Sequence, residues 1–143
     1  YQNIKLDGKN ILIFLIKNPS GANEVIRTIA TNNKINLLII LNDNIADGRD
    51  VSWIWDTNWE SINDKISNID ISGTRAWDMA LRLKYAGFKI DQKNIHNNLN
   101  TSINKALSKL NKKDTLFILP TYTSLLGLQA YLKEKGVASW QNQ

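Results

Sequence analysis

The chain has 143 residues, of which 43% are hydrophobic and 22% charged, and its formal net charge at pH 7 is +5. This length and apolar content fit one globular domain and exclude a disordered segment. The absence of cysteine excludes a disulfide framework, a thiolate zinc site and an enzyme that uses its own thiol, and a single histidine leaves few metal or triad geometries.

The N-terminal part predicts a hairpin followed by a strand, a helix and a second strand. Asp7-Gly8 separates two apolar-bearing segments, which is the pattern of a tight hairpin turn. Continuous apolar runs at 11–16 and 37–41 predict strands covered on both faces. Between them, apolar residues at helical spacing predict a helix over 22–30.

The rest of the chain continues this alternation. Residues 51–60 hold three of the five tryptophans and predict a short helix or turn packed on the sheet edge. The expected elements that follow are a strand over 66–71, a helix over 75–85 closed by Gly87, a weak strand within 88–95, a helix over 101–110, a strand over 116–119 and a helix over 124–134. Alternating strands and helices predict an α/β, three-layer Rossmann-like domain with a mainly parallel sheet, and residues 1–143 form a single domain.

Neither the apolar runs nor the distribution of charge indicates a membrane protein or a nucleic-acid-binding protein. No apolar run approaches the roughly 18 residues of a membrane span, and no signal peptide opens the chain, which favours a soluble, intracellular protein. Because the first residue is Tyr1 rather than methionine, we expect an excised domain or a processed piece. The densest lysine cluster, at 109–113, falls where a helix should end, a position that cations favour.

The functional crevice of a parallel α/β sheet lies beyond the carboxyl ends of its strands. The polar segments 18–21, 42–56, 72–75 and 121–123 should gather there. No P-loop or G-x-G-x-x-G turn occurs, so the domain alone is not expected to hold a nucleotide by its phosphates.

The segment 42–56 carries the most chemistry in the sequence. Arg49 lies among four carboxylates, those of Asp43, Asp47, Asp50 and Asp56. Such a loop suits a cation site, a rigid loop bridged by the arginine, or one acid that orients a partner's base.

Three tryptophans and the single histidine are the other candidates for a functional role. Trp53, Trp55 and Trp59 suit core packing, a substrate platform or a protein interface, because tryptophan is enriched at interface centres. His96 lies in a polar stretch and is expected to be an exposed loop residue rather than a catalyst.

The run 42–56, NDNIADGRDVSWIWD, resembles the signature of the MurT carboxyl-terminal domain family, part of the Mur-ligase-like subunit of lipid II isoglutaminyl synthase. Segments 17–24, 72–87 and 121–123 are similar to the same family in the same order. The resemblance implies a Mur-ligase-type carboxyl-terminal domain of a two-subunit enzyme. That enzyme uses ATP and ammonia from glutamine to amidate the α-carboxyl of D-isoglutamate in the peptidoglycan precursor lipid II, in the cytoplasm near the inner face of the membrane.

The resemblance also implies a partner and roles for single residues. The partner is a GatD-type glutaminase subunit whose Cys–His pair lacks an acid, which this domain supplies. Asp56 is the first choice for that acid and Asp50 the second. The residues expected at the partner interface are Trp53, Trp55 and Trp59, and those expected to contact substrate, by analogy of fold, are Arg49, Ser72, Thr74 and Arg75.

The implied cofactors belong to the whole enzyme. ATP and Mg²⁺ would be bound mostly by a missing upstream domain, which would also carry a zinc ribbon, so this chain alone is expected to bind no cofactor or metal and to be inactive. The residues alone leave an alternative, a non-catalytic Rossmann-like interaction or ligand-binding module. Its motivation is the lack of a P-loop, a cysteine and a plausible catalytic histidine. A third hypothesis, anion or nucleic-acid binding, rests on the charge of +5 alone.

Overall fold

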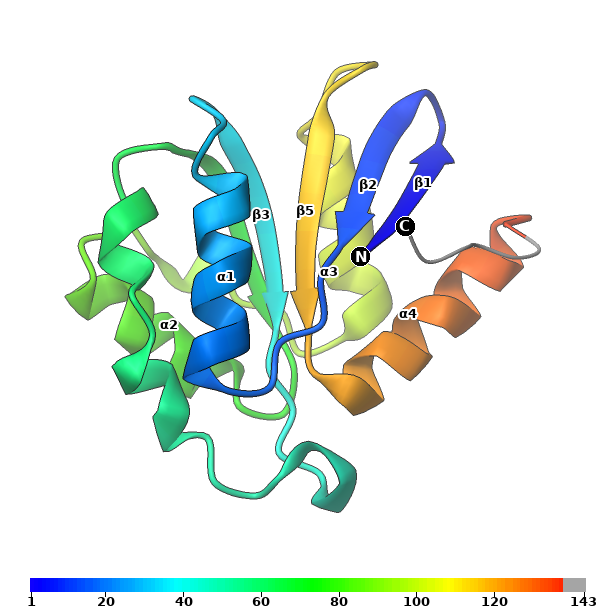
Figure 1. Cartoon of the computed structure of the whole chain (residues 1–143). Coiled ribbons are helices and arrows are strands. Elements are labelled where there is room, and N and C mark those ends of the chain that lie inside the picture. Colours follow the sequence, from blue (N-terminus) through cyan, green and yellow to red (C-terminus); the bar gives the residue numbers. More distant parts are fainter. Residues whose placement is uncertain (138–143) are drawn as a thin grey trace.

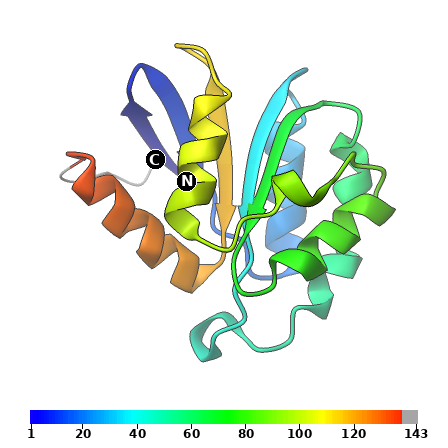
Figure 2. The ribbon, with the colours of Figure 1, turned by 180° about the vertical axis from the view of Figure 1, so that it is seen from behind.

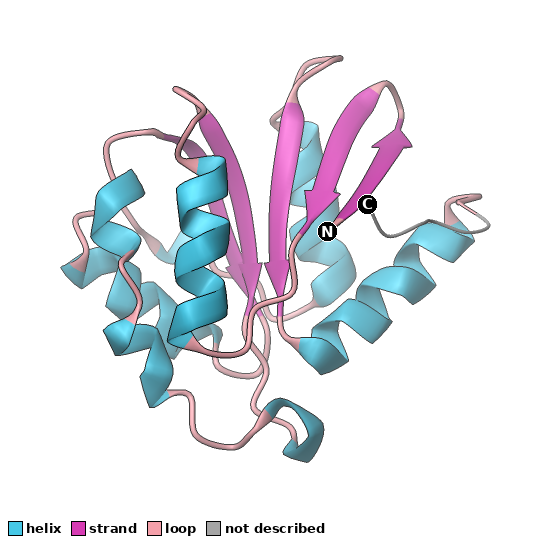
Figure 3. Ribbon diagram, in the orientation of Figure 1, coloured by secondary structure: helices cyan, strands magenta, loops and turns pink. Residues whose placement is uncertain are grey.

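The computed structural model describes residues 1–137, which form a five-stranded sheet between two layers of helices (Figures 1 and 3). The strands are β1 (Gln2–Leu6), β2 (Lys9–Ile13), β3 (Ile35–Ile40), β4 (Ile66–Ser72) and β5 (Thr115–Pro120), in the order β1-β2-β5-β3-β4. β1 and β2 form the antiparallel hairpin, and the other neighbouring pairs run parallel. The α/β three-layer architecture predicted from the sequence is confirmed.

Each face of the sheet has its own hydrophobic core. The helices are α1 (Pro19–Ile29), α2 (Ala76–Tyr85), α3 (Leu99–Ser108) and α4 (Tyr122–Glu134). α1 and α2 cover one face, and α3 and α4 cover the other (Figure 2). Leu37 and Ile39 of β3 point into the first core, whereas Leu38 and Ile40 point into the second. A strand buried on both faces has no polar side to show, which explains its continuous apolar run.

The tryptophan-rich segment forms two 3₁₀ turns, η2 (Ser52–Asp56) and η3 (Trp59–Ile62). The predicted short helix or turn is therefore confirmed. The turns pack against α1 and α2 rather than against the edge of the sheet.

The prediction of a weak strand within 88–95 is wrong. The segment contains the 3₁₀ turn η4 (Gln92–Asn94) and a single bridge from Ile95 to β4. The Asp91 side chain accepts a hydrogen bond from the Lys93 backbone N–H at 2.8 Å, and such local side-chain bonds compete with strand formation.

His96 is buried rather than exposed, which corrects the expectation from its polar surroundings. Only 9% of it is exposed, and its Nε2 lies 2.8 Å from Oδ1 of Asp70 on β4. Lys109 Nζ lies 2.9 Å from the other oxygen of that carboxylate. Because a buried carboxylate is costly without partners, this cluster is the compensation that lets Asp70 lie inside the fold.

In the part of the chain that the structure describes, no helix is long and apolar enough to cross a membrane.

Gly73, directly after β4, gives the first test of the fold. Its φ is +107°, and a Cβ built there overlaps the backbone carbonyl of Leu41. Gly48 is a matched control, because its φ is +89° but a Cβ there meets no atom within 4 Å. Both alanine variants carry backbone strain of about 1–3 kcal/mol. We predict that Gly73→Ala loses at least about 2 kcal/mol more unfolding free energy than Gly48→Ala, because it adds overpacking. Urea denaturation measures both, and equal losses would contradict the close approach.

Candidate functional site

The carboxyl ends of β3, β4 and β5 lie together at one end of the sheet, and three of the four polar segments gather there. Asn42, Ser72, Thr74 and Thr123 line one pocket of about 270 Å³ there. The fourth segment, 18–21, is not part of this lining. There Asn18 caps α1 by accepting a hydrogen bond from the Gly21 N–H, which is ordinary capping.

This pocket has no charged side chain in its lining. A nucleotide triphosphate needs cations or a glycine-rich nest against its phosphates, and the pocket offers only hydroxyls and amides. The residues present therefore do not fit ATP on their own. Among the described residues, no group of three His, Asp or Glu side chains is placed to hold a metal ion.

Residues 42–62, which we call the acidic loop, are fastened to α4 at their start. Asp47 accepts hydrogen bonds from both the backbone N–H and the hydroxyl of Thr123. The amides of Asn42 and Asn44 donate to the same hydroxyl oxygen at 2.9 and 3.0 Å. Because Thr123 lies in the first turn of α4, the Asp47 carboxylate also lies where the helix dipole favours a negative charge.

A second fastening joins the loop to the start of α2. The Thr74 hydroxyl donates to Asp43 Oδ1 at 2.9 Å, and Arg75 Nη1 lies 3.2 Å from Asp43 Oδ2. Arg75 Nε also lies 2.6 Å from Asp78 Oδ2. The Thr74 hydroxyl, followed by the Arg75 guanidinium, holds the pKa of Asp43 below its usual value. Arg75 rather than Arg49 thus bridges two aspartates.

Arg82 of α2 makes the third fastening, and nothing in the sequence pattern singled it out. Its side chain is 5% exposed. It donates to the carbonyls of Ile54 and Thr57 at 3.0 and 2.8 Å and binds both oxygens of Glu60 at 3.0 and 2.8 Å. The guanidinium also lies 5.3 Å from the ring centroid of Trp55. One buried cation therefore joins both 3₁₀ turns to α2.

The three tryptophans of the loop occupy three different environments. Trp59 is fully buried in the core, where its Nε1–H donates to the Ile54 carbonyl at 3.1 Å. This position corrects the expectation that Trp59 contacts a partner, because no surface of it is left for one. Trp53 is half-buried against the same core, and Trp55 is 46% exposed.

Two aspartates of the acidic loop, Asp50 and Asp56, take no part in the three sets of contacts that fasten it. Asp50 is exposed and uses one oxygen to accept the Ser52 N–H at 2.8 Å. That bond from Ser52 holds the pKa of Asp50 below its usual value. Asp56 is exposed, and its side chain forms no hydrogen bond or ion pair with another described residue. Asp50 shares a pocket of about 220 Å³ with Arg49, Trp55 and Arg75.

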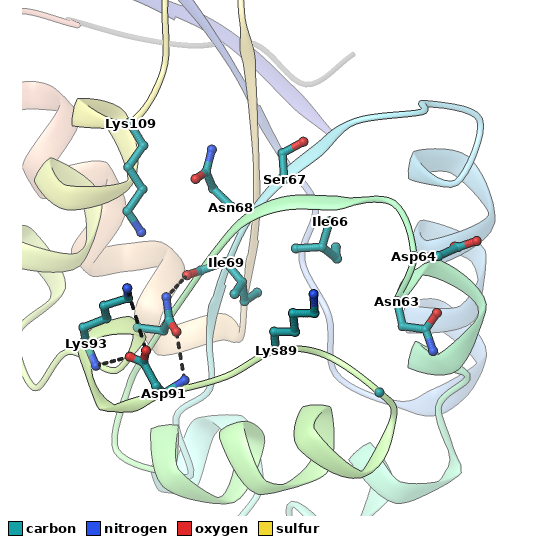
Figure 4. A pocket seen from close by; sticks show the side chains of 12 residues that line it. Asn63, Asp64, Ile66, Ser67, Asn68, Ile69, Lys89, Asp91, Lys93 and Lys109 are labelled. Atoms are coloured by element: carbon teal, nitrogen blue, oxygen red, sulfur yellow. Dashed lines mark hydrogen bonds and ion pairs between the residues drawn. The ribbon is translucent and has the colours of Figure 1, made fainter.

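Another pocket, of about 720 Å³, lies apart from these residues, along the outer edge of β4 (Figure 4). Lys89, Lys93 and Lys109 line it. Lys109 already pairs with Asp70, and the segment that carries Lys89 and Lys93 packs beside β4, which discourages pairing of that edge with another chain. We therefore interpret this pocket as part of a protected sheet edge.

Comparisons with known proteins show which family and which proteins this chain is similar to. The family described as MurT ligase C-terminal matches residues 15–125. Lipid II isoglutaminyl synthase (glutamine-hydrolyzing) subunit MurT of Streptococcus pneumoniae (strain ATCC BAA-255 / R6) is 33% identical over 140 residues, which cover 95% of this chain and 30% of that protein. The same subunit of Staphylococcus aureus (strain COL) is 36% identical over 130 residues, covering 87% and 28%. The chain spans less than a third of the length of these curated relatives.

Replacing Arg82 tests whether one buried cation holds the loop. Ile54 and Thr57 each keep another donor from Trp59, so Arg82→Met removes charge-assisted bonds without leaving either carbonyl unpaired. We predict a loss of about 2–3 kcal/mol in unfolding free energy, measured by urea denaturation. Lys84→Met, on the exposed side of the same helix, should stay within about 0.5 kcal/mol of the parent chain. Equal effects of the two variants would contradict the role of Arg82.

The acids of the site also predict how stability depends on pH. Hydrogen bonds and arginine partners lower the folded-state pKa values of Asp43, Asp50, Glu60 and Asp78. The folded chain therefore binds fewer protons than the unfolded chain, and stability is lost as the pH falls below about 4 towards the folded-state values. Denaturation between pH 3 and 7 should show this loss. Glu60→Gln should flatten part of it, and an unchanged slope would contradict the Arg82–Glu60 pairing.

Proposed function

Because the chain belongs to the MurT ligase C-terminal family, we propose that it is the carboxyl-terminal domain of the ligase subunit of a lipid II isoglutaminyl synthase. The whole enzyme amidates the α-carboxyl of D-isoglutamate in the peptidoglycan precursor, using ATP and ammonia from glutamine. ATP, Mg²⁺ and zinc are bound by residues outside this chain, which is inactive alone.

The role of this chain in glutamine hydrolysis follows from what it lacks. It has no cysteine, and its one histidine is buried against Asp70. It therefore supplies neither the thiol nor the imidazole, which come from a GatD-type glutaminase subunit in a heterodimer. An acid that accepts the Nδ1–H of the partner's imidazole fixes the tautomer of the ring and stabilises the imidazolium during proton transfer.

The single observation that carries the proposal is the division of the loop acids. Asp43 and Asp47 each use both carboxylate oxygens to fasten the loop. Asp50 accepts hydrogen bonds only from its near neighbour Ser52, and the Asp56 side chain accepts none from the described residues. An acid that serves an imidazole across an interface must be exposed and must have lone pairs left to accept the imidazole N–H. Asp50 and Asp56 alone among the four meet that requirement.

The geometry supports Asp50 ahead of Asp56, the reverse of the order favoured by the sequence. The Ser52 N–H orients the Asp50 carboxylate and lowers its pKa, and the exposed carboxylate has lone pairs left for a further donor. Asp56 has no such bond, so its carboxylate must lose rotational freedom when it meets a partner. We therefore assign the triad acid to Asp50, with Asp56 as the alternative.

Substrate contacts are divided between two pockets. Ser72 and Thr74 line the uncharged pocket, which suits the neutral polar groups of an acceptor peptide. Arg49 and Arg75 line the Asp50 pocket. Arg75 is committed to Asp43 and Asp78, whereas Arg49 is exposed and forms no ion pair within the described residues, so Arg49 is the cation available to a substrate carboxylate.

The test uses the full ligase subunit assembled with its glutaminase partner. We predict that Asp50→Asn lowers glutamine-dependent amidation by a factor on the order of 10³–10⁴, as loss of a triad acid does elsewhere. Activity supported by added ammonia should be unchanged, because the ligase reaction does not use the triad. The control Asp64→Asn removes an exposed acid outside the loop's fastenings and should change neither activity.

Three outcomes distinguish the possible roles of this domain. If Asp56→Asn abolishes glutamine-dependent activity and Asp50→Asn does not, the acid is Asp56. If neither variant affects it, the domain donates no acid and acts as a docking or ligand-binding module. If the subunit does not bind the glutaminase at all, the proposed function is wrong.

A further inference from the structure

The outer face of α2 carries a stripe of large apolar side chains that no part of the described chain covers. Trp77, Leu81 and Tyr85 follow one another at intervals of four residues and are 60%, 50% and 73% exposed. Trp55 extends the stripe, because its ring packs edge-on against Tyr85 with centroids 5.7 Å apart. We call these four residues the aromatic stripe.

α2 already buries a separate face in the core. Met79, Ala80 and Leu83 point into the core between the helix and the sheet. A helix that needs only one neighbour has polar residues on its opposite side, and one that is apolar on two sides is covered on both. The aromatic stripe therefore exceeds what this fold needs for its own stability.

The exposed apolar area of the stripe also indicates an interaction surface. Four side chains of this exposure leave on the order of 400 Å² of apolar surface in contact with water. The largest apolar patch on a soluble monomer is typically about 300–600 Å² and is often functional, whereas scattered apolar residues need no explanation. A groove of about 420 Å³ deepens the surface beside the stripe, where Leu81 and Lys84 face Ile90 and Ile95.

We propose that the aromatic stripe is the docking surface for the glutaminase subunit, which places an apolar side chain in the groove beside α2. The inference rests on the proposed function and adds to it the surface by which the partner is held. Trp55 and Tyr85 are the anchors, since tryptophan and tyrosine dominate the energetics of interfaces. An acidic residue of the partner faces Lys84, which is exposed and has no ion-pair partner among the described residues.

Continuity with the Asp50 pocket identifies this occupant. Trp55 lines the same pocket as Asp50 and also touches Tyr85 of the stripe. A protein that brings an imidazole to the carboxylate of Asp50 must therefore cover Trp55, and its surface continues onto α2. Acid and stripe form one contiguous surface.

Tyr1 and α2 lie towards opposite edges of the sheet. Tyr1 lies beside β1, and β1 and β4 are the two opposite edges of the sheet (Figure 1). α2 packs at the β4 end.

The test compares two leucines of equal exposure in the full ligase subunit. Leu81 of the stripe is 50% exposed and Leu126 on the outer side of α4 is 47% exposed, so neither Leu81→Arg nor Leu126→Arg opens a core. We expect Leu81→Arg to raise the Kd for the glutaminase subunit at least 30-fold, the effect of losing an interface hot spot. Leu126→Arg should leave the Kd within about threefold, a range typical of changes outside an interface.

Asp50→Asn separates this inference from the proposed function. It should leave the Kd near that of the parent subunit while abolishing glutamine-dependent turnover. Leu81→Arg should instead retain turnover when the partner is in large excess. Equal Kd values for the two arginine variants would overturn the docking surface even if Asp50 proved to be the acid.

Two further results would also overturn it. One is a loss of self-association in Leu81→Arg with an unchanged Kd for the partner, which would assign the stripe to a second copy of this chain. The other is a loss of thermal stability of the ligase subunit alone with an unchanged Kd, which would assign the stripe to the rest of the same polypeptide.

Discussion

The buried guanidinium of Arg82 is the contact on which the acidic loop depends. The segment 52–62 forms only short 3₁₀ turns, which have poor hydrogen-bond geometry and little stability of their own. Arg82 supplies from α2 what the turns lack, by binding the carbonyls of Ile54 and Thr57 and the carboxylate of Glu60. The planar, permanently charged guanidinium suits this role better than a lysine, because it donates in several fixed directions at once. A loop that follows a strand thus becomes as fixed as the helix behind it.

Rigidity is what an acid needs if it is to act on another polypeptide. Two of the three fastenings use side chains from helices on opposite faces of the sheet, Thr123 of α4 on one face and Arg82 of α2 on the other. Between the fastenings, Asp50 is held by the Ser52 N–H and has lone pairs left for a further donor. In the proposed function, this arrangement orients the carboxylate before the partner arrives, so that little ordering entropy remains to be lost on binding. The aromatic stripe beside it provides the apolar area that charged groups alone do not supply.

The fold and part of the site are predictable from local patterns. Continuous apolar runs such as 37–41 predict strands buried on both faces, and Asp7-Gly8 predicts the hairpin, because these signals depend on neighbouring residues only. The gathering of Asn42, Thr74 and Thr123 follows from the parallel topology alone. Arg82 gives no such signal, since a basic residue in an amphipathic helix normally faces solvent. His96 and Trp59 are similar cases: their burial depends on contacts with Asp70 and Ile54, which the tertiary fold creates.

The structure of the complete synthase with its glutaminase subunit tests the central claim most directly. The quantity to measure is the distance from the loop carboxylates to the imidazole Nδ1 of the partner's histidine. The account predicts a carboxylate oxygen of Asp50 within hydrogen-bond distance, about 2.6–3.2 Å, of that nitrogen. A complex in which the imidazole lies out of reach of both Asp50 and Asp56 would contradict it.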